Sequence, residues 1–355
     1  MTMIFAGGGT GGHLFPGLAV ARVLRDRLPD LKIIFVAARR GMEERVLKGE
    51  FQFMAVDVVG MVGSGWWKKV TGIYPLIKSV FQSFGLIRRL QPKLVFGLGG
   101  YSAGPVGLAA YMTGVPLVLH EQNMIPGMTN RLLARMARKI FVSFEDSAKH
   151  LPADKTIVTG NPVRPELMQA VSSNNNGLFT VLILGGSQGS RFINGIMPEA
   201  VGLMSDLHDN LSVIHQTGET DYENVVNGYK ALAVEAEVLP FIDDMGVAYA
   251  KADLIIARAG ATTIAEITAL QKAAIFIPYP HATHNHQEKN ARFLEEKGAC
   301  KMMLESDLTA EKLADSIREY FEHPEELALM RKRSGECGKM DASHRIADAL
   351  GEYLQ

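Results

Sequence analysis

Residues 3–13 read MIFAGGGTGGH, and residues 180–190 read TVLILGGSQGS. Each stretch opens with a run of apolar residues, continues into glycines, and precedes a helical pattern. A buried strand that turns through glycine into a helix is a typical opening of a doubly wound α/β sheet. Because the chain contains this opening twice, we predict two α/β domains, each with a parallel sheet covered by helices on both faces.

Short aliphatic runs alternate with longer helical patterns along both halves of the chain. In the first half the predicted strands are Met3–Ala6, Lys32–Val36, Leu94–Gly97, Pro116–His120, Lys139–Ser143 and Thr156–Thr159. In the second half they are Thr180–Leu184, Leu211–His215, Val238–Phe241, Leu254–Ala257, Ala274–Ile277 and Cys300–Met303. We therefore predict two Rossmann-like domains, residues 1–163 and 164–340, with a linker near Gly160–Pro165 and a polar loop at Ser172–Gly177.

Length and composition agree with this organisation. The chain has 355 residues, 47% hydrophobic and 21% charged, which is ordinary for globular proteins and long for a single core. Cys300 and Cys337 form no C-x-x-C pair, as expected of free thiols in a reducing compartment. The N-terminus has no basic leader, so we predict a first strand there and not a signal peptide. Leu94–Leu119 lacks charge but holds six glycines and two prolines, which predicts buried strands and loops rather than a membrane-spanning helix.

Charge is distributed unevenly along the chain. Residues 1–163 carry 20 Lys and Arg against 10 Asp and Glu, whereas residues 164–355 carry 17 against 28. A basic half suggests an anionic partner. An anionic membrane surface or a phosphate-bearing substrate fits this pattern, as does nucleic acid, and chance distribution is the alternative.

The first glycine loop, Gly7–Gly12, matches G-x-G-x-x-G after a strand, a pattern that brings backbone close to a phosphate at a helix start. A dinucleotide site would place an acidic residue at the end of the next strand. Arg39 and Arg40 stand there instead, which leaves an NADP-binding hypothesis open. His13 follows the loop directly and is a candidate general base, because histidine ordinarily titrates near neutrality. A hydrogen-bonding or capping histidine is the alternative.

Two further glycine loops are candidate ligand sites. Gly97–Gly107 follows a predicted strand and indicates either a second phosphate-bearing ligand or tight strand–helix packing. Gly185–Gly189 matches G-x-S-x-G, so Ser187 is either a hydrolase nucleophile, with Asp253 and His281 as possible partners, or a phosphate donor at a helix start.

Ala257–Glu266 is a third junction of strand, glycine and helix. Its residues Ala261–Thr263 open the helix toward an anion, and Glu266 shares a face with Thr262 four residues earlier. A carboxylate there suits ribose hydroxyls, and a solvated helix position is the alternative. His281, His284 and His286 are spaced loosely for zinc, so we predict a polar sugar-binding loop and no metal. His120–Asn123 reads HEQN, which fails the H-E-x-x-H zinc motif but lies at the carboxyl end of a predicted strand.

The segment Gly60–Lys93 combines basic with apolar residues, and no acidic residue occurs between Asp57 and Glu121. This composition predicts an interfacial membrane surface, with part of the apolar stripe serving as helix core. The residues we expect at the membrane are Trp66, Trp67, Lys68, Lys69, Phe81, Phe84, Arg88 and Arg89.

Seven motifs occur together in one order. They are GGTGGH-x-F-P-G-x-A-x-A (Gly8–Ala21), G-x-G-G-Y-x-x-G-P (Gly97–Pro105), HEQN, GNPVR (Gly160–Arg164), GGSQG, FIDDM (Phe241–Met245) and HQ-x-x-NA (His286–Ala291). In this order and spacing the chain, from Met3 to about Gly298, resembles the MurG family of bacterial N-acetylglucosaminyltransferases. Two departures are GGGTGG for the commoner AGGTGG, and RAGATTIAE for RSGALTVSE, which leaves side-chain roles at Ala261 and Ala265 open.

The resemblance implies a GT-B fold, in which two Rossmann-like domains flank a cleft. The C-terminal domain would bind UDP-N-acetylglucosamine, and the N-terminal domain would bind a muramyl-pentapeptide linked to undecaprenyl diphosphate. A last helix, about 341–355, would pack back on the N-terminal domain. The implied substrate contacts are Thr10, Gly11, Gly12, Asn123, Arg164, Ser187, Ile242, Ala261, Thr262, Thr263, Ile264, Ala265, Glu266 and Gln287.

The resemblance also implies an inverting transfer with His13 as the catalytic base and no cofactor or metal. Helix starts and Arg164 would stabilise the departing diphosphate. The chain would lie peripherally on the cytoplasmic face of the bacterial membrane and bind no nucleic acid. Another GT-B enzyme, such as a lipid glycosyltransferase or a 2-epimerase, is the first alternative. The further alternatives are an NADP oxidoreductase, a serine hydrolase and a non-catalytic sugar-nucleotide binding protein, and assays of activity and NADP binding would distinguish them from a transferase.

Overall fold

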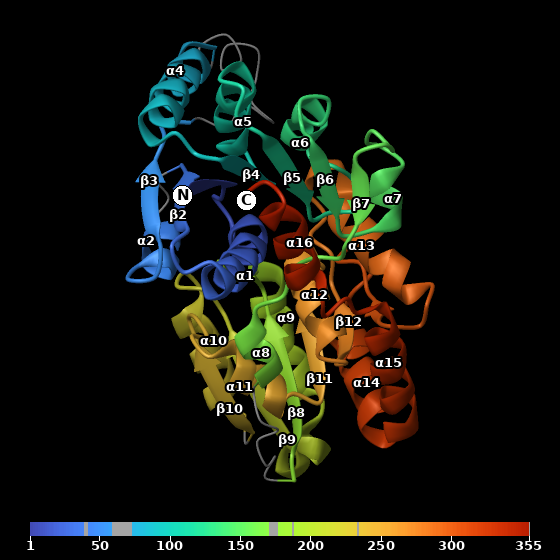
Figure 1. Cartoon of the computed structure of the whole chain (residues 1–355). Coiled ribbons are helices and arrows are strands. Elements are labelled where there is room, and N and C mark those ends of the chain that lie inside the picture. Colours follow the sequence, from blue (N-terminus) through green and yellow to red (C-terminus); the bar gives the residue numbers. More distant parts are fainter. Residues whose placement is uncertain (39–41, 59–72, 170–176, 187, 233, 355) are drawn as a thin grey trace. The chain divides into compact units, whose positions relative to one another are not determined.

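Each of the two opening glycine loops follows the first strand of a parallel sheet (Figure 1). A computed structural model of the chain describes residues 1–38, 42–58, 73–169, 177–186, 188–232 and 234–354. The chain forms two compact units, one of Met1–Val163 with Lys339–Gln355 and the other of Arg164–Gly338.

The N-terminal unit has a seven-stranded sheet in the order β3-β2-β1-β4-β5-β6-β7, and every described pair of neighbours is parallel. Its strands are β1 (Thr2–Gly7), β2 (Lys32–Ala37), β3 (Gln52–Ala55), β4 (Leu94–Gly99), β5 (Leu117–Glu121), β6 (Lys139–Val142) and β7 (Thr156–Val158). The chain winds outward from β1 and then crosses to β4, which brings the ends of β1 and β4 together.

The helices of this unit are α1 (Gly11–Arg27), α2 (Met42–Leu47), α4 (Ile73–Leu90), α5 (Ala103–Met112), α6 (Met128–Leu133), α7 (Glu145–Ala148) and α16 (Ala342–Gly351). The core is aromatic at its centre, where Phe5 of β1 stacks on Phe35 at 5.0 Å between ring centroids and meets Phe96 edge-on at 5.4 Å. All three rings are fully buried on the same face of the sheet, where they join β2, β1 and β4.

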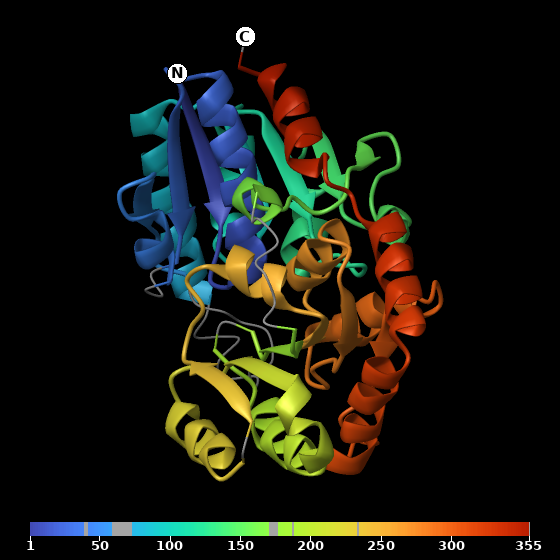
Figure 2. The same cartoon turned by 90° about the horizontal axis from the view of Figure 1, so that it is seen from below.

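The last helix, α16, packs on α1 within the N-terminal unit (Figure 1 and Figure 2). Ile346 and Leu350 are fully buried in the same hydrophobic cluster as Leu18 of α1. The Ser343 hydroxyl donates to the carbonyl of Val163 at 3.2 Å, which fastens the start of α16 to the end of the first segment. The final residues of the chain therefore complete the core that the first residues begin.

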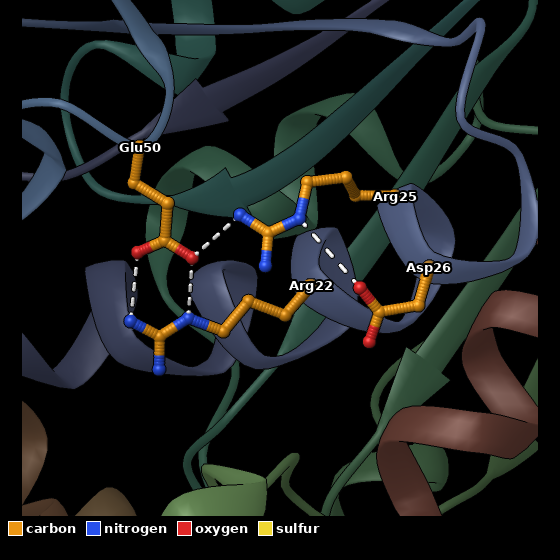
Figure 3. Close-up of polar contacts among 4 residues, drawn as sticks. All are labelled: Arg22, Arg25, Asp26 and Glu50. Atoms are coloured by element: carbon orange, nitrogen blue, oxygen red, sulfur yellow. Dashed lines mark hydrogen bonds and ion pairs between the residues drawn. The ribbon is translucent and has the colours of Figure 1, made fainter.

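A cluster of ion pairs joins α1 to the segment before β3 (Figure 3). Arg22 donates to both carboxylate oxygens of Glu50 at 2.7 Å, and Arg25 donates to one of them at 2.9 Å. The Arg22 hydrogen bond, together with the two positive charges, lowers the pKa of Glu50. Asp26 lies on the far side of Arg25, at 3.6 Å, and balances the second guanidinium.

The C-terminal unit has a six-stranded parallel sheet in the order β10-β9-β8-β11-β12-β13. Its strands are β8 (Phe179–Leu184), β9 (Leu211–Gln216), β10 (Glu235–Leu239), β11 (Leu254–Ala257), β12 (Ala273–Phe276) and β13 (Lys301–Met302). Its helices are α8 (Pro165–Gln169), α9 (Arg191–Gly202), η1 (Ser205–Asn210), α10 (Tyr222–Lys230), α11 (Met245–Lys251), α12 (Ala261–Ala269), η2 (Thr283–Asn285), α13 (His286–Glu295), α14 (Ala310–Glu322) and α15 (Pro324–Cys337). Both sheets confirm the predicted doubly wound α/β class.

One expectation about a segment is corrected, and one strand was not predicted. Leu94–Leu119 contains not only strands and loops but also α5, which has Pro105 in its first turn and continues through Ala109 and Ala110 although Gly104 and Gly107 lie within it. Gln52–Ala55 forms an edge strand that the sequence did not reveal, because its half-exposed side chains give no continuous apolar run. Among the helices of the described ranges, none has the length and apolar character needed to span a bilayer.

Candidate active site

His13 lies in the first turn of α1, immediately after the glycine turn that ends β1. Its ring faces the second glycine loop: a side chain added at Gly99 would come within 3.2 Å of the imidazole, and one added at Gly100 would come within 2.9 Å of the Gly8 carbonyl. Both loop glycines have positive φ, +88° and +76°. The two predicted loops thus meet around one histidine, because β1 and β4 are neighbours in the sheet.

Gln122 fixes the orientation of this histidine. The Gln122 amide nitrogen donates to the Leu98 carbonyl at 2.8 Å, so its oxygen is the acceptor that lies 3.0 Å from His13 Nδ1. This arrangement assigns the proton of neutral His13 to Nδ1 and its basic lone pair to Nε2. The same amide nitrogen approaches Nδ1 of His120 at 3.1 Å. Burial lowers the pKa of His120 to about 3, with the nearby His13 adding to the effect, so His120 is neutral and can accept.

Glu121 organises the loop that follows β5. One carboxylate oxygen accepts from the backbone of Asn123 at 3.0 Å, and the other accepts from the backbone of Gly127 at 3.0 Å and the side chain of Asn130 at 2.8 Å. A buried carboxylate that accepts this many hydrogen bonds fixes the loop around it. Asn123, predicted to contact substrate, is therefore held in place, and its carbonyl accepts from Ser147.

The predicted contacts Thr10, Gly11 and Gly12 form the start of α1. Thr10 is exposed and caps the helix without a side-chain hydrogen bond. The neighbouring Gly9 N–H donates to the buried carboxylate of Glu43. The Gly9 N–H is thus already bound within the chain, which weighs against the dinucleotide hypothesis for the first loop.

In the C-terminal unit, Arg164 and Glu266 meet although they are far apart in the sequence. Arg164 donates to one carboxylate oxygen of Glu266 through two nitrogens, at 3.0 and 3.3 Å. The hydroxyl of Tyr249 donates to the other oxygen at 2.9 Å. Glu266 lies on α12, is 5% exposed, and is therefore not the solvated helix residue of the alternative hypothesis.

The helix start at α12 contains the predicted contacts of the third junction. Gly260 is extended and caps the helix, and Ala261, Thr262 and Ile264 are buried, whereas Thr263 and Ala265 are half-buried. N–H groups in a first helical turn lack partners within the helix and carry partial positive charge. This helix start can therefore bind an anion, with the carboxylate of Glu266 one turn further on.

Gln216 joins the GGSQG loop to Ile242. Its amide nitrogen donates to the Gly186 carbonyl at 3.0 Å, and its oxygen accepts from the Ile242 N–H at 3.0 Å. The loop is closely packed, since a side chain at Gly189 would lie 1.7 Å from the Thr217 carbonyl. Ile242 is thereby fixed, but its N–H already has a partner in this structure.

Arg258, in the junction Ala257–Glu266, is a buried residue whose importance the sequence did not reveal. It donates to the carbonyls of Ile277 and Pro278 at 3.0 and 3.2 Å, and to the hydroxyl of Ser190 at 2.6 Å. Its guanidinium also pairs with Glu305. Because Ser190 caps α9, Arg258 joins the ends of β8, β11 and β12 into one rigid edge.

The HQ-x-x-NA segment begins α13. The side-chain oxygen of Gln287 accepts from the Tyr279 N–H at 2.9 Å and so shapes the loop before it. His281 and His284 are exposed and His286 is half-buried. No group of three or more metal-ligating side chains forms among the residues that the structure describes.

A groove in the C-terminal unit borders Arg164. Its walls come from α8 and from the start of α11, and its lining residues are Arg164, Glu166, Leu167, Asp243, Asp244, Met245, Gly246 and Val247. The FIDDM motif thus contributes both a groove wall and the fixed Ile242.

Several predicted residues lie outside the described part of the chain, namely Arg39, Arg40, Trp66, Trp67, Lys68, Lys69 and Ser187. Of the remaining membrane candidates, Phe81 is 72% exposed on α4, whereas Phe84 is half-buried against the core under the guanidinium of Arg88. Arg88 and Arg89 are exposed.

Comparisons with known proteins give the family. Models of the glycosyltransferase family 28 N-terminal and C-terminal domains match residues 3–142 and 180–346. A Myxococcus xanthus protein named UDP-N-acetylglucosamine–N-acetylmuramyl-(pentapeptide) pyrophosphoryl-undecaprenol N-acetylglucosamine transferase is 44% identical over 100% of this chain and 93% of its own length. The crystal structure of Acinetobacter baumannii MurG is similar with a TM-score of 0.78 and 32% identity, covering 99% of both chains.

A more distant structure shares the fold alone. The UDP-GlcNAc 2-epimerase from Neisseria meningitidis, bound to UDP-GlcNAc, has a TM-score of 0.68 but only 16% identity, with 99% of this chain and 100% of that chain covered. The chain is 44% identical to the Myxococcus xanthus transferase over its whole length but only 16% identical to this epimerase, so sequence identity assigns the chain to the transferases. The chain therefore belongs to glycosyltransferase family 28 and, within it, to the MurG family of N-acetylglucosaminyltransferases.

Proposed function

We propose that this chain transfers N-acetylglucosamine from UDP-N-acetylglucosamine to a muramyl-pentapeptide linked to undecaprenyl diphosphate, in peptidoglycan synthesis. The observation that carries the proposal is the likeness, along the entire chain, to transferases whose names state this reaction. The geometry of each unit supplies groups that suit the chemistry.

The C-terminal unit is the proposed donor domain. The start of α12, residues Ala261–Thr263, binds the diphosphate, and Glu266 accepts hydrogen bonds from the ribose hydroxyls. Ile242 contacts the uracil, and Gln287 contacts the sugar. Arg164, which pairs with Glu266 of the same helix in this structure, stabilises the charge of the departing UDP.

The N-terminal unit is the proposed acceptor domain and supplies the base. Nε2 of His13 takes the proton of the acceptor hydroxyl, whose oxygen attacks the anomeric carbon. The bond between that carbon and the UDP oxygen breaks with inversion, and UDP leaves with the electron pair. Thr10, Gly11, Gly12 and Asn123 hold the reacting groups near His13, and the loop Gly97–Gly107 receives the acceptor diphosphate.

The same unit is proposed to lie peripherally on the cytoplasmic face of the bacterial membrane. On α4, Leu76, Ile77 and Phe81 are 39%, 50% and 72% exposed, and the helix ends in the exposed Arg88 and Arg89. Exposed apolar side chains beside cations are typical of an interfacial helix on anionic lipid. The proposal extends to Trp66–Lys69, which precede this helix in the sequence.

A donor and acceptor panel tests the proposal. The purified chain is incubated with UDP-N-acetylglucosamine, UDP-glucose or UDP-galactose, with and without the lipid diphosphate–muramyl-pentapeptide. We expect one new disaccharide product, of inverted anomeric configuration, only when UDP-N-acetylglucosamine and the acceptor are both present, and none from the other two donors. Conversion of the donor to its 2-epimer without acceptor, or transfer of another sugar, would instead identify a different enzyme of this fold.

A further inference from the structure

Tyr249 is a buried tyrosine on α11 that the catalytic scheme does not use. Its side chain is 1% exposed, and its hydroxyl donates to Oε2 of Glu266 at 2.9 Å. The two residues come from different helices, α11 and α12. A tyrosine hydroxyl has a single proton to donate, and here it is committed to one carboxylate oxygen.

The opposite oxygen of Glu266 is held separately. Oε1 accepts from Nε and the second guanidinium nitrogen of Arg164, at 3.3 and 3.0 Å. The terminal torsion of a glutamate is broad when nothing restrains it. With Arg164 on one oxygen and Tyr249 on the other, the plane of the Glu266 carboxylate is fixed.

The fixed carboxylate still has capacity for a ligand. Two carboxylate oxygens offer about four acceptor positions, and Arg164 and Tyr249 together donate three hydrogen bonds, which leaves about one position for a ligand. Burial, with the negative charge of Glu266 as the next cause, raises the pKa of Tyr249 well above its ordinary value. The phenol is therefore protonated at physiological pH and serves as a permanent donor.

We propose that Tyr249 is a positioning residue, which aims the Glu266 carboxylate at the nucleoside sugar hydroxyls and so sets a preference for a ribonucleotide over a deoxyribonucleotide. The inference rests on the proposed function, which assigns Glu266 to the donor ribose. Without the Tyr249 hydroxyl, Oε2 loses its donor and the carboxylate turns toward Arg164. The ribose hydroxyls then lose a correctly oriented acceptor, while the uracil and diphosphate contacts remain.

The test measures binding of UDP and of 2′,3′-dideoxy-UDP by calorimetry. The variants are Tyr249→Phe and, as a matched control, Tyr229→Phe, which removes another buried hydroxyl of the same unit that lies 3.1 Å from His215. A misoriented carboxylate weakens a hydrogen bond between a charged group and the ribose. We therefore expect UDP to bind Tyr249→Phe about fivefold to tenfold more weakly. Its affinity for dideoxy-UDP should equal that of the native chain, and Tyr229→Phe should leave the ratio of the two affinities unchanged.

Steady-state kinetics and a double variant add two readouts. In transfer assays Tyr249→Phe should raise the KM for the donor by the same factor and leave kcat nearly unchanged. In a Glu266→Ala background, Tyr249→Phe should cost no further UDP affinity, because the tyrosine acts through the carboxylate.

The outcomes separate the two proposals. Equal losses for UDP and dideoxy-UDP in Tyr249→Phe, or an additive loss in the double variant, would overturn the positioning role. A native chain that binds UDP without preferring it over the dideoxy form would also overturn this inference while the transfer reaction stands. A native chain that binds no UDP overturns the proposed function, and the inference with it. Retained dideoxy-UDP binding by Tyr249→Phe reports that its pocket is folded.

Discussion

The Nδ1–H of His13 donates to the side-chain oxygen of Gln122, 3.0 Å away. Gln122 is itself oriented by its bond to the Leu98 carbonyl at 2.8 Å. The pair therefore sets the tautomer of His13 before any substrate binds, and it assigns the basic lone pair to Nε2. A base with a preset tautomer needs no rearrangement at the moment of proton transfer.

Replacing His13 by alanine tests its role as the base. We expect kcat to fall by about 10² to 10⁴-fold, the range typical of general-base assistance, with UDP-N-acetylglucosamine affinity nearly unchanged. Turnover is measured with the lipid-linked acceptor and donor affinity by calorimetry. A His13→Ala variant as active as the native chain would remove His13 from the mechanism.

Changing Gln122 tests whether the tautomer matters. Gln122→Leu removes the acceptor of the His13 proton, and we expect kcat to fall by roughly tenfold, at the low end of base effects. Gln122→Glu supplies a carboxylate that stabilises the imidazolium and raises the pKa of His13. The acidic limb of the pH–kcat profile should therefore move to higher pH in Gln122→Glu. An unmoved limb would contradict the assigned pairing.

The sequence predicted the elements that bring these groups together better than it predicted the contacts themselves. His13 could be placed because it directly follows a glycine turn, a local signal. Its partner Gln122 is 109 positions away, and their meeting depends on β1, β4 and β5 being successive neighbours in the sheet. The motif HEQN indicated a polar strand end but not which of its four side chains would face the histidine.

The C-terminal unit shows the same division. Glu266 was predicted from its spacing after Thr262, which is a helical property. Its partners Arg164 and Tyr249 come from other elements, so only tertiary packing selects them. Arg258 belongs to the RAGATTIAE motif, yet a strand-end arginine can face solvent or the interior, and the sequence pattern does not distinguish the two.

Substitutions on α4 test the membrane surface. Ile77→Ser with Phe81→Ser removes two exposed apolar side chains, each worth roughly 1–2 kcal/mol when buried in lipid, so vesicle affinity should fall by at least about tenfold. Leu203→Ser is the control, because Leu203 is 51% exposed in the C-terminal unit. Sedimentation with phosphatidylglycerol vesicles measures binding. Equal binding by the double variant and the control would exclude this face of α4.

Two buried histidines predict how stability depends on pH. Burial lowers the pKa of His120 and of His215 to about 3 in the folded chain, below the ordinary value of about 6.5. Between these values the unfolded state binds more protons, so stability falls as pH drops below about 6.5. At pH 5 the loss is about 2 kcal/mol for each histidine.

The measurement is the urea midpoint at pH 7.5 and pH 5. His215→Gln should be less stable at pH 7.5, since it breaks the contacts of His215 with Tyr229 and Asn194. It should nevertheless lose less stability on acidification than the native chain does. The same acid-induced drop in both proteins would show that His215 is not responsible.

The buried ion pair of Arg258 and Glu305 provides a test of what stabilises the sheet edge formed by the ends of β8, β11 and β12. The side chains are 10% and 18% exposed, so Arg258→Met leaves Glu305 as an uncompensated, largely buried charge. We expect the C-terminal unit to lose about 3–5 kcal/mol of stability and UDP to bind more weakly, because Ser190 also loses its donor. Arg258→Met combined with Glu305→Met removes the stranded charge, and urea unfolding should find the double variant more stable than the single one. If instead the stability losses of Arg258→Met and Glu305→Met, each measured alone, add in the double variant, Arg258 stabilises the edge through the carbonyls of Ile277 and Pro278 and not through the ion pair.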